Sequence, residues 1–278
     1  MGKLARVLIW AWVAFNVMLF GWIAFTSLKG SGEVFGSPLE LPARPEWINY
    51  ENAWSVSEMG RGFFNSVVIV LVASVTTLIL AAPTAYMLTR SGARSSGPLT
   101  TFFAVGMGIP IQAIIVPVFV LMQKVSMTFN ETFGWWDDRI SLGAIYVATS
   151  LPFAVFLLTS FFRTLPGEIE EAAALDGAGG VRIFAQIMLP LAQPGLITAL
   201  ILTVISLWNE TLLALMLITD TEQHTLPQAL LGLYQTMQYT SNWGGLFAGV
   251  VIVILPIVAI YIWLSRRIME GMTLGAGK

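Results

Sequence analysis

The sequence contains no cysteine and one histidine, His224. Disulfide bonds, thiolate nucleophiles and cysteine-ligated metal sites are therefore excluded, and a single histidine argues against a transition-metal site. Charge is also scarce: Asp, Glu, Lys and Arg make up 11% of the 278 residues, whereas soluble proteins carry about 25%. A soluble fold of this length would need more charge to cover its surface. The deficit excludes soluble enzymes, nucleic-acid-binding proteins and disordered chains as first interpretations.

Long apolar segments predict an all-α, polytopic membrane protein. Hydrophobic residues form 56% of the chain, and the mean hydropathy is +0.77. A membrane-spanning helix needs about 20 apolar residues with few charges. We expect six such helices in one domain covering residues 1–278, and the six segments are 7–28, 63–89, 101–123, 141–162, 195–218 and 245–265.

Three features qualify these spans. We expect Pro110 and Pro117 to interrupt the third span, and Glu210 lies inside the fifth. Lys3 and Arg6 precede the first span as they would in a signal peptide. However, its apolar run exceeds a signal core and no clear cleavage site follows, so we favour an uncleaved helix.

The distribution of basic residues predicts the orientation. Six spans place both termini on one side, and the side that carries more Lys and Arg in short loops is cytoplasmic. With both termini inside, the cytoplasmic basic residues are Lys3, Arg6, Arg90, Arg94, Arg163, Arg182, Arg266, Arg267 and Lys278. The outer ones are then Lys29, Arg44, Arg61, Lys124 and Arg139. We therefore predict cytoplasmic N- and C-termini, with a cytoplasmic tail at 266–278.

The loops differ in character. Residues 29–62 contain three prolines and several glycines, and we expect an ordered extracytoplasmic connection. Residues 219–244 mix polar and apolar side chains, which is typical of an amphipathic helix or a re-entrant segment.

The cytoplasmic loop 163–194, here called the elbow, has the pattern of two short helices. Pro166 suits a helix start, and three glutamates favour the positive end of a helix dipole. Gly177, Gly179 and Gly180 stop the first helix, a second runs over about 181–188, and Pro190 ends it. Small and apolar residues here suit docking in a partner's groove. From the residues alone, an elbow lying on the lipid headgroups is an equally good interpretation.

The elbow resembles a family signature. Glu171-Ala172-Ala173, Gly177 four positions later and Ile187-Met188-Leu189-Pro190 match every fixed position of the EAA motif, E-A-A-x3-G-x9-I-x-L-P. This motif is the signature of permease subunits of binding-protein-dependent ABC importers. Trp208-Asn209-Glu210 and the C-terminal run 271–276 are similar to the maltose and glycerol-phosphate type of sugar importer.

The resemblance implies a type I ABC importer permease of the bacterial inner membrane. Such a subunit forms half of a translocation pathway that works by alternating access. Its partners would be a second permease, two ATPase subunits and an extracytoplasmic solute-binding protein. The ATPase-coupling residues carried over are Glu171, Ala172, Ala173, Asp176, Gly177 and Phe184.

The chain itself is expected to be non-catalytic. It lacks the G-x-x-x-x-G-K-[ST] loop that cradles ATP phosphates. No cofactor is expected on this chain, because ATP and Mg²⁺ would bind the partner ATPases.

Polar residues within the spans are candidates for the substrate pathway. An ionisable residue in a membrane helix is costly and should face protein or water. Thr203, Ser206 and Glu210 recur at helical spacing on one face of the fifth span. The full candidate set is Asn209, Glu210, Ser206, Thr203, Gln112 and Asn65. Helix packing through small and polar side chains is the competing interpretation.

Two other classes of protein are weighed against the importer subunit. A self-sufficient secondary transporter would need an inverted repeat or a chain of intramembrane ionisable residues. The sequence contains neither, since Glu210 stands nearly alone. A membrane-embedded enzyme would need a metal cluster or a Ser/His pair within the spans, and none is present.

Overall fold

The computed structural model describes residues 2–56, 58–90 and 96–276. The protein is 83% helical, and these residues contain no strand, as the sequence predicts. The chain divides into two compact units. Unit 1 consists of residues 1–65 and 224–258, and unit 2 of residues 66–223 and 259–278. Two long helices, α4 (Met59–Arg90) and α14 (Trp243–Ala276), have residues in both.

Unit 1 contains the first span and the loop that follows it. Its remaining elements are α1 (Lys3–Thr26), α2 (Ser31–Gly36), α3 (Ile48–Glu51), a π-helical turn (Asn52–Val56) and α13 (Leu226–Thr240). The side chains of α1 are apolar and mostly exposed. A helix that is apolar on all sides needs lipid or another helix around it.

Buried polar groups hold the loop 29–62 together. The Lys29 side chain is buried, and its Nζ donates to the carbonyls of Ser37 (2.8 Å) and Pro38 (3.1 Å). The Asn49 amide donates to the carbonyls of Ser27 (3.0 Å) and Lys29 (2.9 Å). Buried polar groups are tolerated when they are hydrogen-bonded in this way. These bonds fit an ordered loop, and the extracytoplasmic connection stays a prediction.

The loop 219–244 holds an amphipathic helix, which confirms one of the two forms expected. In α13, Leu226, Ala229 and Leu233 are buried, whereas Tyr234 and Tyr239 are exposed. The buried positions follow the three-to-four-residue spacing of one helix face. This helix packs inside unit 1.

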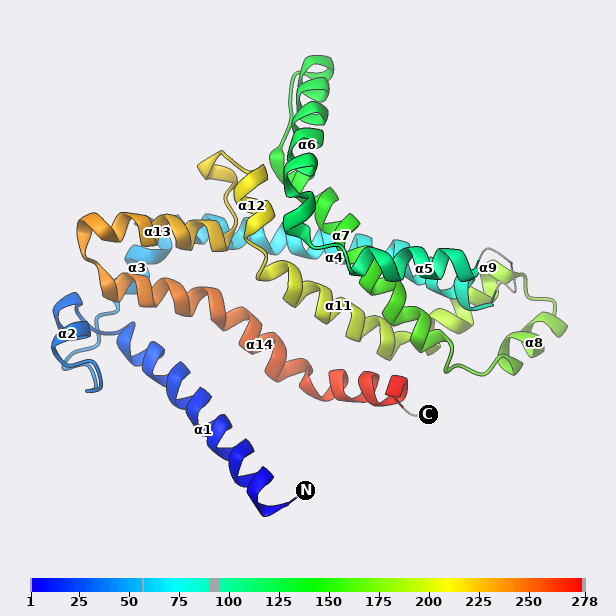
Figure 1. The fold of residues 1–278 in the computed structure, drawn as a ribbon, viewed down its shortest axis with the longest axis horizontal. Coiled ribbons are helices and arrows are strands. Elements are labelled where there is room, and N and C mark those ends of the chain that lie inside the picture. Colours follow the sequence, from blue (N-terminus) through cyan, green and yellow to red (C-terminus); the bar gives the residue numbers. More distant parts are fainter. Residues whose placement is uncertain (1, 57, 91–95, 277–278) are drawn as a thin grey trace. The chain divides into compact units, whose positions relative to one another are not determined.

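Unit 2 is built around α7 (Asp138–Phe162). Both α5 (Ser96–Met107) and α11 (Gln193–Trp208) pack against it (Figure 1). The core combines alanines, which allow close helix approach, with larger apolar side chains. These buried residues include Ala81, Ala85, Ala154, Leu158, Phe162, Met188, Ala192 and Ala199. The other elements are α6 (Ile111–Phe133), α8 (Glu168–Leu175), α9 (Gly180–Ile183), a π-helical turn (Phe184–Met188), α10 (Leu189–Leu191), α12 (Leu212–Leu217) and a 3₁₀ turn (Thr221–Gln223).

The predicted spans are largely confirmed. Among the described residues, five helices are long and apolar enough to cross a membrane, and a bent pair gives up to six. The five are Lys3–Thr26, Met59–Arg90, Ile111–Phe133, Asp138–Phe162 and Trp243–Trp263. The pair is Gly180–Leu191 with Gln193–Trp208, bent by 72°. The side chains of the predicted tail 266–278 lie outside the described part of the chain.

Three local predictions are wrong. The third span, predicted over 101–123, breaks at Pro110, as expected, but the helix that could cross a membrane is α6, Ile111–Phe133, which continues through Pro117. The fifth span ends at Trp208, so Glu210 lies in a break before α12 rather than inside a helix. Pro190 does not end the second elbow helix, because α10 follows the π-helical turn directly and continues to Leu191.

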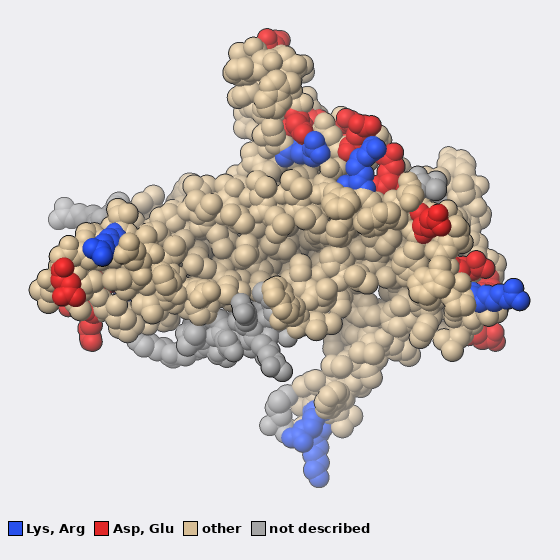
Figure 2. Space-filling view, turned by 180° about the vertical axis from the view of Figure 1, so that it is seen from behind, with Lys and Arg blue, Asp and Glu red and all other residues tan. Residues whose placement is uncertain are grey.

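The charged side chains are distributed as a membrane protein requires. In Figure 2, Lys, Arg, Asp and Glu gather in a few places, and most of the face drawn is uncharged. Lipid-facing surfaces exclude charge in this manner.

Gly195, near the start of α11, lies directly against the Phe161 ring of α7. A Cβ atom there would lie 2.5–2.9 Å from ring carbons of Phe161. We expect Gly195→Ala to destabilise the protein by about 1–3 kcal/mol through overpacking. The matched control is Gly143→Ala in α7, where a Cβ would meet nothing within 4 Å. The measurement is the thermal midpoint of the detergent-solubilised chain, and equal midpoints for the two variants would contradict the packing described.

Candidate functional site

The first candidate site is the elbow. Helix α8 ends in a turn that needs glycine, because Gly177 has φ +81°, a conformation that side chains disfavour. The Gly177 amide donates to the carbonyl of Ala174 (3.0 Å), and the Ala178 amide donates to that of Ala173 (3.0 Å). These bonds satisfy carbonyls at the helix end. The turn separates α8 from α9 (Figure 1).

The structure separates the sequence-predicted coupling residues into two groups. Glu171, Ala172, Asp176 and Gly177 are exposed. Ala173 is buried in the core of unit 2, and Phe184 packs against that core. One set therefore presents a surface, whereas the other anchors the elbow to the spans.

Sequence reasoning missed a polar cluster beneath the elbow. Arg90 Nε lies 2.6 Å from Glu170 Oε1 in an ion pair. The Tyr86 hydroxyl donates to Glu170 Oε2 (2.9 Å). The available sequence signals were Arg90 at the end of a span, Tyr86 four residues before it, and Glu170 directly before the EAA motif. None of these signals shows which acid pairs with which base.

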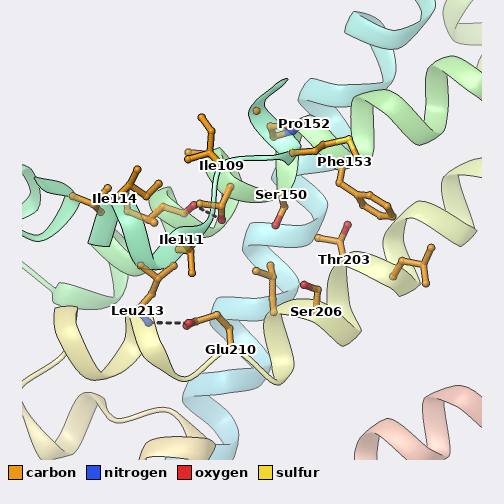
Figure 3. A pocket seen from close by; sticks show the side chains of 18 residues that line it. Ile109, Ile111, Ile114, Ser150, Pro152, Phe153, Thr203, Ser206, Glu210 and Leu213 are labelled. Atoms are coloured by element: carbon orange, nitrogen blue, oxygen red, sulfur yellow. Dashed lines mark hydrogen bonds between the residues drawn. The ribbon is translucent and has the colours of Figure 1, made fainter. Parts of the chain in front are cut away.

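The second candidate site is a cavity of about 740 Å³ in unit 2 (Figure 3). Its wall is formed by the break between α5 and α6, by α7, by α11 and by the break before α12. Most of the wall is apolar, with Ile109, Ile114 and Phe153 among its residues. The hydroxyl-bearing side chains are Thr149, Ser150, Thr203 and Ser206, and Glu210 adds a carboxylate. An apolar cavity with a few polar groups is the usual form of a small-molecule site.

Glu210 holds the break between α11 and α12. Its Oε1 accepts a hydrogen bond from the Leu213 amide (2.8 Å). Its Oε2 accepts from the Ala214 amide (3.3 Å) and the Tyr146 hydroxyl (2.9 Å). The carboxylate thus caps the first turn of α12, where backbone amides lack helical partners. Its position is set by these donors within the protein.

Thr203 differs from its polar neighbours in the cavity wall. Its side chain is buried, and within the described part of the chain its Oγ1 has no hydrogen-bond partner. In Figure 3, Thr203 and Ser206 follow one another along the wall above Glu210. A buried hydroxyl without a partner is costly, so a bound hydroxyl group would be favourable there.

The remaining predicted pathway residues lie elsewhere. Asn209 is exposed, and its amide donates to the carbonyl of Ile205 (2.8 Å). Gln112 is exposed and is not among the residues that line the cavity. Asn65 belongs to unit 1, where its amide donates to the carbonyl of His224 (2.9 Å). The structure therefore brings together Thr203, Ser206 and Glu210 only, as far as the described residues go. In the part of the chain that the structure describes, no group of three His, Asp or Glu side chains is placed to hold a metal ion.

Comparison with known proteins identifies relatives along nearly the whole chain. The chain is 35% identical to the diacetylchitobiose uptake system permease protein NgcG of Streptomyces coelicolor, with 98% of this chain and 86% of that protein covered. It is 30% identical to the trehalose transport system permease protein SugB of Mycobacterium tuberculosis, with 96% and 97% covered.

A solved structure shows the same fold. One chain of a bacterial ABC transporter involved in the import of the acidic polysaccharide alginate matches with a TM-score of 0.77. The identity is 22%, and the match covers 95% of this chain and 94% of that one. Residues 77–272, which include both the elbow and the cavity, match the family model described as "Binding-protein-dependent transport system inner membrane component". The chain belongs to this family of inner-membrane transport components.

Proposed function

We propose that the protein is the permease subunit of an ATP-driven importer of carbohydrates. The observation that carries the proposal is the elbow, whose exposed face is built on the EAA residues and a glycine-dependent turn. The relatives support the substrate class, since the name of one includes diacetylchitobiose and that of another includes trehalose. A non-catalytic transport subunit of this kind needs an energy source on another chain.

The partners follow from the family and the proposed role. A second permease would complete the translocation pathway, two ATPase subunits would bind at the cytoplasmic side, and a solute-binding protein would deliver substrate outside. The basic residues support cytoplasmic termini in a bacterial inner membrane. Residues 1–278 would act together as one permease domain, as proposed from the sequence.

The exposed face of the elbow is the proposed docking surface for an ATPase. Glu171, Ala172, Asp176 and Gly177 would enter the partner's cleft, while Ala173 and Phe184 hold the elbow to unit 2. Small side chains at the exposed positions allow a groove to close tightly. ATP-driven movement of the partner would then alter the bundle between two states.

Gly177→Trp and Glu171→Arg are expected to abolish transport while membrane insertion stays normal. The first change fills the docking face with bulk and the second reverses its charge. The measurement is the amount of ATPase subunit that co-purifies with the tagged chain, together with uptake of sugar.

A matched control separates docking from backbone strain. Gly134 also has a left-handed conformation, with φ +74° and open space around it, and it ends α6 away from the elbow. Gly134→Trp therefore carries a similar strain and should keep the ATPase bound. Normal uptake by a well-expressed Gly177→Trp variant would contradict the docking proposal.

The cavity is the proposed contact point for substrate. Thr203 and Ser206 offer hydroxyl groups to a sugar, and Glu210 fixes the wall between them and α12. Asn209, Gln112 and Asn65 remain proposed pathway residues on the sequence argument, outside this cavity. The second permease would supply part of the contacts with the substrate.

Thr203→Val tests this contact, because valine keeps the shape and removes the hydroxyl. Loss of one hydrogen bond corresponds to about 0.5–1.5 kcal/mol, so KM for the sugar should rise roughly 2- to 12-fold. The control is Thr198→Val on the same helix, whose hydroxyl already donates to the carbonyl of Pro194 (2.9 Å). Uptake into proteoliposomes is the measurement, with diacetylchitobiose and trehalose as the first sugars. Identical KM values for both variants and the parent chain would remove Thr203 from the pathway.

A further inference from the structure

Three helix ends meet at the guanidinium of Arg90. Arg90 is the last residue of α4, and its Nη2 donates to the carbonyls of Leu165 (2.8 Å) and Phe162 (3.3 Å), where α7 ends. Its Nε pairs with Glu170, in the first turn of α8. Helix C-termini carry partial negative charge and N-termini partial positive charge. The cation and the carboxylate are therefore each placed at helix ends of opposite charge.

Glu170 is attached to α4 at two points. Arg90 contacts Oε1, and Tyr86, one helical turn earlier, donates to Oε2. The Tyr86 ring packs between Phe162 (5.7 Å between centroids) and Phe184 (5.0 Å). The two-point contact fixes the direction of the Glu170 side chain as well as its distance from α4.

This ion pair is largely shielded from water. The relative exposures of the Arg90 and Glu170 side chains are 23% and 16%. Charge pairs in such surroundings are screened less than those on the surface. Separating them would leave an incompletely compensated charge beneath the elbow, which is costly. Movement of α8 together with α4, which keeps the pair intact, therefore costs less free energy than movement of α8 alone, which would break the pair.

The two sides of α8 differ sharply. Glu168, Glu171 and Ala172 are exposed, whereas Glu170 faces α4. The helix thus has a free surface and, on another side, a polar attachment to a membrane span. A short helix arranged in this way can pass a movement from one side to the other.

We propose that the Arg90–Glu170–Tyr86 cluster is the link that carries movement of the elbow into α4. The proposal rests on the docking function proposed above, because the elbow must first be moved by an ATPase. The three residues are positioning residues, since they touch neither ATP nor substrate. Without the link, α8 would still move with the docked ATPase, but α4 would be displaced only weakly.

The absence of cysteine from the chain makes a direct test possible. A single cysteine carrying a bimane fluorophore is placed either on α4, as Met87→Cys, or on the elbow, as Glu168→Cys. Both positions are exposed. Each reporter is measured in the purified complex with its co-purifying subunits, before and after addition of ATP with vanadate. No transported sugar is needed.

With the link intact, both reporters should change their emission on addition of ATP and vanadate. With Glu170→Gln, the elbow reporter should keep its response. The α4 response should fall at least roughly fivefold, the lower end of typical coupling between two sites. Tyr86→Phe keeps the ion pair and loses one hydrogen bond, so an intermediate response is expected. It also provides the test if Glu170→Gln does not assemble.

The control is Glu131→Gln in the complex that carries the α4 reporter, because it removes an exposed acid on α6, outside the elbow and the cavity. This variant should respond as the parent does. An undiminished α4 response in both Glu170→Gln and Tyr86→Phe would overturn the link. Loss of the elbow response in Glu170→Gln would also overturn it, since Glu170 would then act in docking. A silent elbow reporter in the parent complex would contradict the docking function itself.

Discussion

The ion pair between Arg90 and Glu170 ties the elbow to the bundle, and the arrangement around it depends on this contact. The guanidinium also binds two carbonyl groups where α7 ends, so one side chain joins α4, α7 and α8. Arginine suits this position because its planar group offers several donors in fixed directions. A lysine would supply the charge without the geometry. The exposed EAA face is presented in one orientation because the opposite side of α8 is held in this way.

A second carboxylate performs a comparable task inside unit 2. Backbone groups freed by a break in a membrane helix must find partners within the protein. Glu210 supplies them for α12, and Tyr146 supports the carboxylate from α7. The break opens the wall of the cavity beside Thr203 and Ser206, so the capped interruption and the proposed sugar contact belong to one local structure.

Composition and apolar length predicted the helical membrane fold because those patterns are local. The EAA spacing likewise located the elbow, and the glycine cluster 177–180 located the end of its first helix. Breaks in the helices were harder to predict. Pro117 lies within a continuous helix, whereas residues 209–211 separate α11 from α12 without any proline. The Arg90–Glu170 pair joins residues 80 positions apart, and one sequence does not show which distant charges meet. Thr203 and Ser206 were predicted by helical spacing. Asn209 was selected because it lies beside that face and Gln112 because it shares a helix face with Gly108, and both lie outside the cavity.

The central claim is that α4 and the elbow move together through Arg90 and Glu170. The most direct measurement is the structure of the assembled importer determined without nucleotide and again with ATP and vanadate. The account predicts that the ion pair is present in both states and that the cytoplasmic end of α4 is displaced together with α8. An elbow that shifts while the pair separates and α4 stays in place would contradict it.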